Sequence, residues 1–203
     1  MLLLAIDTST SAITVAVHDG ASVLAESSTI DARGHGEHLA PAIVTVLQEA
    51  GRSAPDVTAV VAGLGPGPFT GLRVGLATAA AMGQALGIPT YGICSLDALG
   101  RAAGPGRVLV ATDARRREVY FATYAAGVRV TGPDVAKPAD VLVEADRAVG
   151  EGALRYSEIF GIPIDDRVLY PSGEALIALA AELVRPKPTS PAAPASPASG
   201  TGR

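Results

Sequence analysis

The sequence contains few of the residues on which disulfide, metal and nucleophile chemistry depends. Its 203 residues include one cysteine, Cys94, and three histidines. A single cysteine cannot form a disulfide within the chain, which fits a reducing compartment and favours a cytoplasmic protein. No serine lies in a Gly-x-Ser-x-Gly segment and no histidine is well placed as its base, so we expect no peptidase activity.

The histidines do not form a metal motif. His35 and His38 are three residues apart near the start of the first expected helix, with no obvious third ligand, so capping or exposure to solvent is the simpler interpretation. His18 is expected to point outward from a strand. We therefore expect no metal site and no catalytic residue of the chain's own.

Long apolar segments and an excess of positive charge are also absent. The run Met1-Leu-Leu-Leu-Ala-Ile6 is shorter than a signal peptide, lacks a basic segment and leads straight into Asp7. The most apolar helical pattern is interrupted by Arg73 and Gln84 and is too short to cross a bilayer, so no membrane contact is expected. The net charge of -4 argues against a large nucleic-acid surface.

The most distinctive stretch runs from Gly63 to Gly87. It connects two apolar, β-branched runs, Val57 to Ala62 and Ile88 to Ile93, which we expect to be buried strands. Gly65-Pro-Gly-Pro68 predicts a turn, because proline fixes φ and glycine permits unusual backbone angles. Thr70 then stands where a helix N-cap is expected.

The helix expected after this turn consists mostly of glycine and alanine. A helix that is apolar on all sides is normally covered on most of them. Each glycine inside a helix costs up to about 1 kcal/mol relative to alanine, so a compensating gain is needed. We expect that gain to be a close backbone approach, either to the sheet or to another helix.

The remaining pattern predicts an α/β protein with two subdomains. Three strands, Leu2 to Ile6, Ala12 to His18 and Ser22 to Ile30, precede a helix from Glu37 to Ala50. That helix should begin near His38, because Pro41 fits only its first turn. A third helix is expected from Ser95, its N-cap, to Ala102. The predicted units are an N-terminal subdomain at residues 1–103, a smaller one at 104–185, and a disordered Pro/Ala/Ser tail at 186–203.

Four segments together resemble the TsaB (YeaZ) family: Leu4-Ala-Ile-Asp-Thr-Ser-Thr10, Gly65-Pro-Gly-Pro-Phe-Thr-Gly-Leu-Arg-Val-Gly75, Asp113-Ala-Arg-Arg-Arg-Glu-Val-Tyr120 and Gly150-Glu-Gly-Ala153. The resemblance implies an actin/Hsp70-like (ASKHA) fold with two βββαβα-type subdomains, the second reduced. It further implies a non-catalytic scaffold subunit of the system that adds a threonylcarbamoyl group to N6 of adenosine 37 in ANN-decoding tRNAs.

The partners implied by the same resemblance are the catalytic TsaD subunit, in a heterodimer, and the ATPase TsaE, in a larger assembly. Contact with tRNA is expected mainly through the complex, and a homodimer when the chain is alone. The family uses two helices for these contacts, the predicted 38–50 helix and the glycine-rich one. The interface residues expected on them are Leu39, Ile43, Leu47, Arg73, Val74, Ala77 and Met82.

Nucleotide binding is the main alternative role for the polar turns. Asp7 and Thr8 resemble the first phosphate turn of actin-like ATPases, and Gly65 and Gly67 precede a helix whose N–H groups can face an anion. ATP or ADP could therefore bind weakly or at the partner interface. Retained fold architecture is the favoured interpretation of both turns, since the lysine of a P-loop is missing.

An independent enzyme, either an actin-like ATPase or an M22-type metalloprotease, is the alternative function. The catalytic sister subunit carries a His-x-x-x-His metal pair after the strand that follows the glycine-rich helix. The matching segment here, Gly92 to Leu99, contains no histidine, which favours the scaffold. The one basic cluster, Arg115-Arg-Arg117, is either a solvated hairpin turn or a contact for tRNA phosphates or partner carboxylates.

Overall fold

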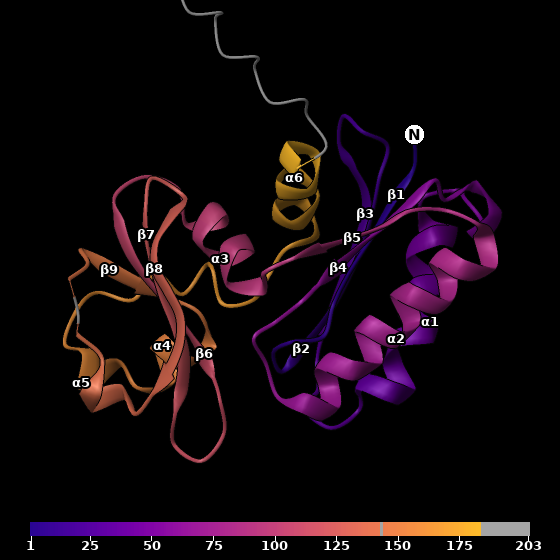
Figure 1. Cartoon of the computed structure of the whole chain (residues 1–203). Helices are drawn as coiled ribbons and strands as arrows, with labels where there is room; N and C mark the ends of the chain where they lie inside the picture. The colour runs from indigo at the N-terminus through magenta and orange to yellow at the C-terminus, as the bar shows by residue number, and fades with distance from the viewer. Residues whose placement is uncertain (143, 184–203) are drawn as a thin grey trace, which may run out of the picture.

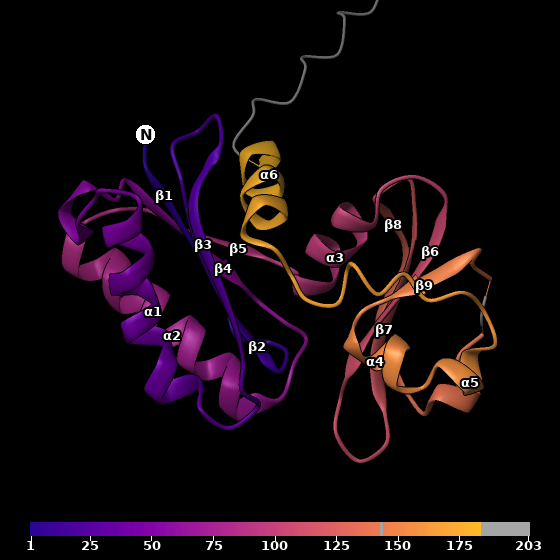
Figure 2. The same ribbon diagram turned by 180° about the vertical axis from the view of Figure 1, so that it is seen from behind.

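The computed structural model describes residues 1–142 and 144–183; the predicted disordered tail lies outside these residues. The chain forms two α/β subdomains joined side by side (Figures 1 and 2). The strands are Leu3–Asp7 (β1), Ala12–His18 (β2), Val23–Ile30 (β3), Ala59–Gly63 (β4), Thr90–Ile93 (β5), Arg107–Asp113 (β6), Val119–Ala125 (β7), Val128–Ala136 (β8) and Arg147–Val149 (β9). The α-helices are His35–Glu49 (α1), Phe69–Leu86 (α2), Ser95–Ala103 (α3), Glu151–Arg155 (α4), Ser157–Phe160 (α5) and Gly173–Leu183 (α6), with short 3-10 turns at Ala54–Asp56 (η1) and Pro138–Asp140 (η2).

The first sheet has the strand order β3-β2-β1-β4-β5. Strands β1, β2 and β3 form an antiparallel meander, and β4 and β5 continue the sheet parallel to β1. The predicted βββαβα order is therefore confirmed. Both central strands, β1 and β4, are buried along their whole length, as expected for continuous apolar runs covered on two faces.

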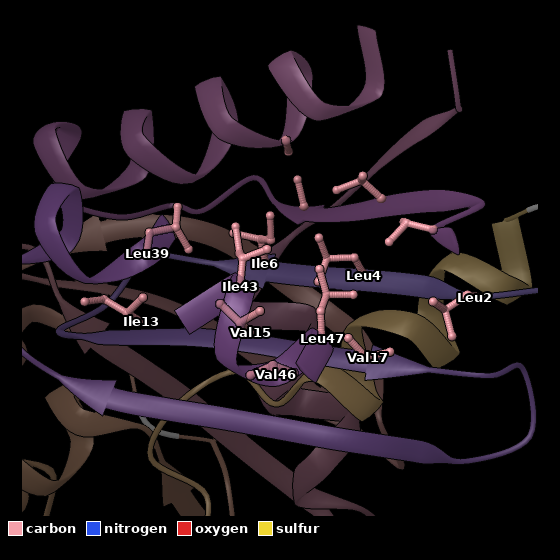
Figure 3. Close-up of a cluster of buried hydrophobic side chains, with 14 residues drawn as sticks. Leu2, Leu4, Ile6, Ile13, Val15, Val17, Leu39, Ile43, Val46 and Leu47 are labelled. Atoms are coloured by element: carbon pink, nitrogen blue, oxygen red, sulfur yellow. The ribbon is translucent and has the colours of Figure 1, made fainter. Parts of the chain in front are cut away.

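Helices α1 and α2 cover one face of this sheet and lie side by side (Figures 1 and 2). Figure 3 shows how α1 is attached: its apolar stripe points at the strand side chains. This core cluster includes Leu4, Ile6, Val15, Leu39 and Ile43. Burial of one such side chain stabilises the fold by about 1.5–3 kcal/mol, so the stripe accounts for the position of the helix.

The opposite face of the first sheet is covered by α6, at the C-terminal end of the described chain. Ala175, Leu176 and Ala180 of this helix pack against Ala5 and Val61 of the sheet. The last part of the range 104–185, which the sequence assigns to the second subdomain, thus packs on the first. Helix α3 shows largely the converse, because Leu96, Leu99 and Ala103 belong to the core of the second sheet, while its Ala98 packs in the core of the first.

The second sheet has the order β8-β7-β6-β9 and repeats the first with one strand fewer. Its β6, β7 and β8 again form an antiparallel meander, and β9 is parallel to β6. Where the first subdomain has helix α1 after its third strand, the second has only the 3-10 turn Pro138–Asp140. The prediction of two related units, the second reduced, is confirmed.

Two predicted helix starts and one further predicted N-cap are wrong. Helix α1 begins at His35, so Pro41 lies inside it rather than in its first turn. Helix α2 begins at Phe69 with Pro68 as its N-cap, which places Thr70 within the helix. Helix α3 begins at Ser95 as predicted, but its N-cap is Cys94. The hydroxyl of Ser95, the expected cap, donates a hydrogen bond to the Asp7 carboxylate instead.

Candidate functional site

A cleft of about 750 Å³ lies between the two subdomains. Its walls come from the β1–β2 turn, the first turns of α1 and α2, and the β6–β7 hairpin. Figures 1 and 2 show this hairpin projecting at the same end of the molecule as the first turns of both helices. Thr8, one of the predicted phosphate-turn residues, lines the cleft; Asp7, Gly65 and Gly67 are not among its lining residues.

Asp7 points into the protein rather than into the cleft. Its Oδ1 accepts hydrogen bonds from the backbone N–H of Ser9 (2.8 Å) and the Ser9 hydroxyl (2.7 Å). Its Oδ2 accepts a hydrogen bond from the Ser95 hydroxyl (2.5 Å). The Ser95 hydroxyl oxygen in turn accepts a hydrogen bond from the backbone N–H of Gly65 (3.1 Å). The carboxylate therefore holds together the ends of β1 and β4 and the start of α3.

Burial governs the ionisation of this carboxyl group. Asp7 is only 1% exposed, and burial raises its pKa, while the hydrogen bonds from Ser95 and Ser9 partly offset that rise. A carboxylate in such a turn can hold a metal-bound phosphate only if an oxygen faces the ligand. Here both oxygens face protein donors, which supports a structural role.

The glycines of α2 allow the helix to touch the first turn. The Thr8 hydroxyl donates to the backbone O of Gly71 (2.8 Å) and accepts from the N–H of Gly75 (3.0 Å). A Cβ added at Gly75 would lie 2.4 Å from that hydroxyl oxygen. Of the two expected reasons for the glycines, the structure shows close approach to the sheet and its β1–β2 turn.

Gly67 brings the second predicted turn against the first. A Cβ on Gly67 would lie 2.1 Å from the carbonyl oxygen of Ser9. The two turns expected to hold phosphates are thus packed on one another, and of their residues only Thr8 and Thr10 of the first turn and Pro68 of the second line the cleft.

A carboxylate connects the two subdomains at the β1–β2 turn. Glu151, the first residue of α4, accepts hydrogen bonds from the backbone N–H and the hydroxyl of Ser11. Gly152, beside it, packs so closely on Thr112 that an added Cβ would lie 2.8 Å from the Thr112 carbonyl carbon. Glu151 and Gly152 both belong to the Gly150-Glu-Gly-Ala153 segment, whose sequence alone does not indicate this contact.

The expected partner interface is only partly on the surface. Leu39, Ile43 and Leu47 are 1%, 6% and 4% exposed and belong to the core beneath α1, which corrects their assignment. One apolar stripe cannot both cover the sheet and face a partner. Val74 and Met82 are half-buried against the same core. Arg73 and Ala77 are exposed on α2 as expected.

The residues that do face outward include Arg73 and Ala77, which the sequence indicated, and five others that it did not. We call the surface that they form the outer helix face, and it comprises Ala40, Val44, Phe69, Arg73, Ala77, Ala80 and Ala81. Phe69 is 70% exposed and its ring lies 4.5 Å from the Arg73 guanidinium carbon, while Val44 is 54% exposed. Exposed apolar side chains gathered on one surface are a feature that protein contact sites share.

The histidines lie in three different settings. His35 is buried, contrary to expectation, and its Nε2 bonds the backbone O of Thr10 (2.9 Å). His38 is exposed and its Nε2 lies 3.2 Å from Asp31, and the ring of His18 accepts the N–H of Gly20. Within residues 1–142 and 144–183, no group of three or more His, Cys, Asp or Glu side chains is arranged for a metal.

The segment from Gly92 to Leu99, which contains no histidine, is occupied by structural contacts. Asp97 accepts a hydrogen bond from the Tyr124 hydroxyl (2.8 Å) and lies 3.5 Å from Arg129. Burial and this hydrogen bond raise the pKa of Tyr124, and burial raises that of the Cys94 thiol. Among the described helices, none has the length and apolar character needed to cross a membrane.

Fold and cleft together define an α/β protein of the actin/Hsp70-like class, in which internal hydrogen bonds engage the carboxylate of the β1–β2 turn. A family model described as "TsaD: tRNA N6-adenosine threonylcarbamoyltransferase" matches residues 23–184. The solved structure of YeaZ from Pseudomonas aeruginosa superimposes with a TM-score of 0.77 at 31% identity, over 89% of this chain and 91% of that one. The chain belongs to the TsaB (YeaZ) family.

Two sequence relatives complete the comparison. The tRNA threonylcarbamoyladenosine biosynthesis protein TsaB of Escherichia coli (strain K12) is 37% identical over 128 residues, which are 61% of this chain and 55% of that protein. The uncharacterized protein ML0378 of Mycobacterium leprae (strain TN) is 47% identical over 182 residues, 87% of this chain. The chain spans about half the length of these two relatives, 55% and 50% respectively.

Proposed function

We propose that the chain is a non-catalytic subunit of the system that makes threonylcarbamoyladenosine in tRNA, and that it binds the TsaD-type subunit through the outer helix face. Family membership supports the pathway, since the E. coli relative is named for that biosynthesis. The observation that carries the binding role is the exposed surface of α1 and α2. It combines a protruding aromatic ring, Phe69, with the small side chains Ala77 and Ala80, which permit close helix packing.

A scaffold role also agrees with the chemistry of the polar turns. Both oxygens of the Asp7 carboxylate accept hydrogen bonds from Ser9 and Ser95. The segment from Gly92 to Leu99 contains no histidine, and its Asp97 accepts a hydrogen bond from Tyr124. In this proposal the transfer chemistry belongs to the partner, in the cytoplasm, and tRNA is contacted mainly through the complex. The outer helix face also pairs two copies of the chain when the partner is absent.

The substitution Ala77→Asp tests the proposal. Ala77 is exposed in the free chain, so the variant should fold normally, but an interface would bury an unpaired charge. We expect the affinity for the TsaD-type subunit to fall roughly a hundredfold or more. Titration calorimetry gives the affinity, and size-exclusion chromatography with light scattering gives the stoichiometry.

The matched control is Ala178→Asp, an exposed alanine on α6, far along the chain from the outer helix face. This control should bind as the wild type does. Equal affinity for both variants would place the interface elsewhere, and unfolding of Ala77→Asp would show that α2 is packed more tightly than its exposure indicates.

A further inference from the structure

One face of the second sheet lacks part of the cover that its counterpart on the first sheet has. Helix α4 follows the parallel strand β9 as α2 follows β4, so the face that carries α4 corresponds to the face that carries α1 and α2. On the first sheet, α1 packs on β2 and β3. On the second, η2 takes the place of α1 in the chain, and α4 and α5 lie beside the lower half of the sheet (Figure 1).

The middle strands of the two meanders show the difference. Val15 and Val17 of β2 point at α1 and are 0% exposed. On β7, the equivalent strand, Tyr124 is buried on the side of α3. Thr123 and Ala125 belong to the other side, where Thr123 is half-buried and Ala125 is exposed. The second sheet is therefore closed on one face and open over part of the other.

A hollow of about 600 Å³ lies on this open part, and we call it the β7–β8 groove. Its apolar lining comprises Phe121 and Ala125 of β7, Val130 of β8 and Leu142 of the segment after η2. Val130 is 64% exposed and Leu142 is 85% exposed. The hydroxyls of Thr123 and Thr131, which also line the groove, bond each other at 2.6 Å, and this lowers the cost of covering them with an apolar side chain.

The charged groups around the groove are mainly acidic. Two carboxylates line it, those of Asp140 and Glu144. Two more lie beside it: Asp134, opposite Phe121 on β8, and Asp146, which accepts the backbone N–H of Arg107. The cations on this side are Arg107, in the lining, and Lys137, the N-cap of η2. Four carboxylates against two cations give the groove and its edges a negative charge.

The arginines near the groove are held by other contacts. The Nε and Nη2 atoms of Arg107 donate to the backbone O of Glu144 (3.1 and 2.7 Å), which fixes one wall of the groove against the start of β6. Arg129, the remaining cation of β8, lies 3.5 Å from Asp97 of α3 on the opposite face of the sheet. Neither contact neutralises the carboxylates of Asp140 and Glu144.

We propose that the β7–β8 groove binds an amphipathic helix of a partner protein, with aliphatic side chains toward Phe121 and Val130 and lysines or arginines toward Asp140 and Glu144. The helical form of the occupant is inferred from α1, whose apolar stripe covers the equivalent part of the first sheet. Its basic flanks are inferred from the acidic edge of the groove. The inference does not depend on the proposed function, because the outer helix face belongs to the other subdomain.

Fluorescence anisotropy with a labelled synthetic helix of about 18 residues, roughly five turns, tests the proposal. The peptide carries leucine along one face and lysine on both flanks. We expect saturable binding to the full chain that weakens with salt, and no binding of the counterpart in which glutamate replaces lysine. Val130→Lys should weaken binding about tenfold or more. The matched control is Ile30→Lys, which adds the same charge at an equally exposed (64%) residue of β3, the edge strand of the first sheet, and should leave binding unchanged.

A second variant keeps the test valid if Val130→Lys disturbs β8. Leu142→Lys, at a side chain outside the strands, should weaken binding to a similar extent. Binding should survive Ala77→Asp, which separates the groove from the outer helix face. Equal weakening by Val130→Lys and Ile30→Lys, or loss of binding in Ala77→Asp, would overturn the proposal. So would equally tight binding of a peptide with a central proline, because the chain would then be taking an extended segment rather than a helix.

Discussion

At the scale of single residues, Asp7 is a side chain that was expected to bind a ligand but forms hydrogen bonds within the protein instead. Its position after β1, at the turn Asp7-Thr-Ser-Thr10, was predictable from the sequence. Its hydrogen bond to Ser95 was not, because that contact joins residues 88 positions apart. Local sequence indicates which turns are polar, whereas tertiary packing decides whether their oxygens face solvent or protein.

The raised pKa of Asp7 predicts a pH dependence of stability. A folded-state pKa above the unfolded value of 3.8 means that the native state binds the proton more tightly. Stability from this group is then fully present below pH 3.8 and is lost as the pH rises through the folded-state pKa. Asp7→Asn cannot titrate, so the melting temperature of the wild type relative to this variant should fall as the pH is raised from 4 to 7.

Asp165 is the control of opposite sign. Its hydrogen bond with Arg167 lowers its pKa to about 2, so its contribution is present above pH 3.8 and is lost on acidification toward pH 2. The melting temperature of the wild type relative to Asp165→Asn should therefore rise as the pH rises from 2 to 4. Parallel melting curves for wild type and Asp7→Asn between pH 4 and 7 would refute the assigned pKa shift.

At the scale of elements, the periodic patterns predicted most of the helices and strands. The errors lie at helix starts and in the short helices α4 and α5, which the sequence did not predict. The three N-terminal strands agree with their predicted ranges to within one or two residues. Helix α1 starts earlier than predicted because burial of His35 and Leu39 outweighs the cost of a proline inside the helix. Leu39, Ile43 and Leu47 were placed on the wrong side of α1, since a sequence cannot show which surface its apolar stripe covers.

Pro41 in α1 predicts a stabilising substitution. Proline lacks the N–H that would bond the carbonyl of Glu37, and its ring crowds that carbonyl. Pro41 is exposed, so Pro41→Ala should add about 1–3 kcal/mol to the free energy of unfolding, as measured by urea denaturation. Pro55, in the first turn of η1 where an N–H is not needed, is the control, and Pro55→Ala should bring no gain. A loss of stability in Pro41→Ala would mean that α1 depends on the bend.

At the scale of the whole molecule, Glu151 makes a polar contact between the subdomains at the β1–β2 turn. Its carboxylate accepts two hydrogen bonds from Ser11 on the other subdomain. No periodicity or composition predicts a pairing between residues 140 positions apart, which is why the sequence indicated two subdomains without indicating how they are joined.

Replacement of Glu151 by alanine should loosen the subdomains without unfolding either. The Ser11 amide loses its acceptor, so its hydrogen exchange should accelerate roughly tenfold, while amides in β1 and β6 keep their protection. Amide exchange by mass spectrometry at the β1–β2 turn measures this. Glu174→Ala, an exposed glutamate in the first turn of α6, is the control. Unchanged exchange at Ser11 would show that this contact does not hold the subdomains together.

Because α6 packs on the first sheet, it also determines when the first core can be completed during synthesis on the ribosome. Strands β1, β2, β4 and β5 emerge early, but the face that includes Ala5 and Val61 gains its cover only when residues up to Ala180 have left the exit tunnel. Until then a nascent chain exposes an apolar sheet face, which is a target for chaperones and for aggregation. A synthesis product that stops before Gly173 retains both sheets but not that cover, so the first core is complete only after α6 has been made.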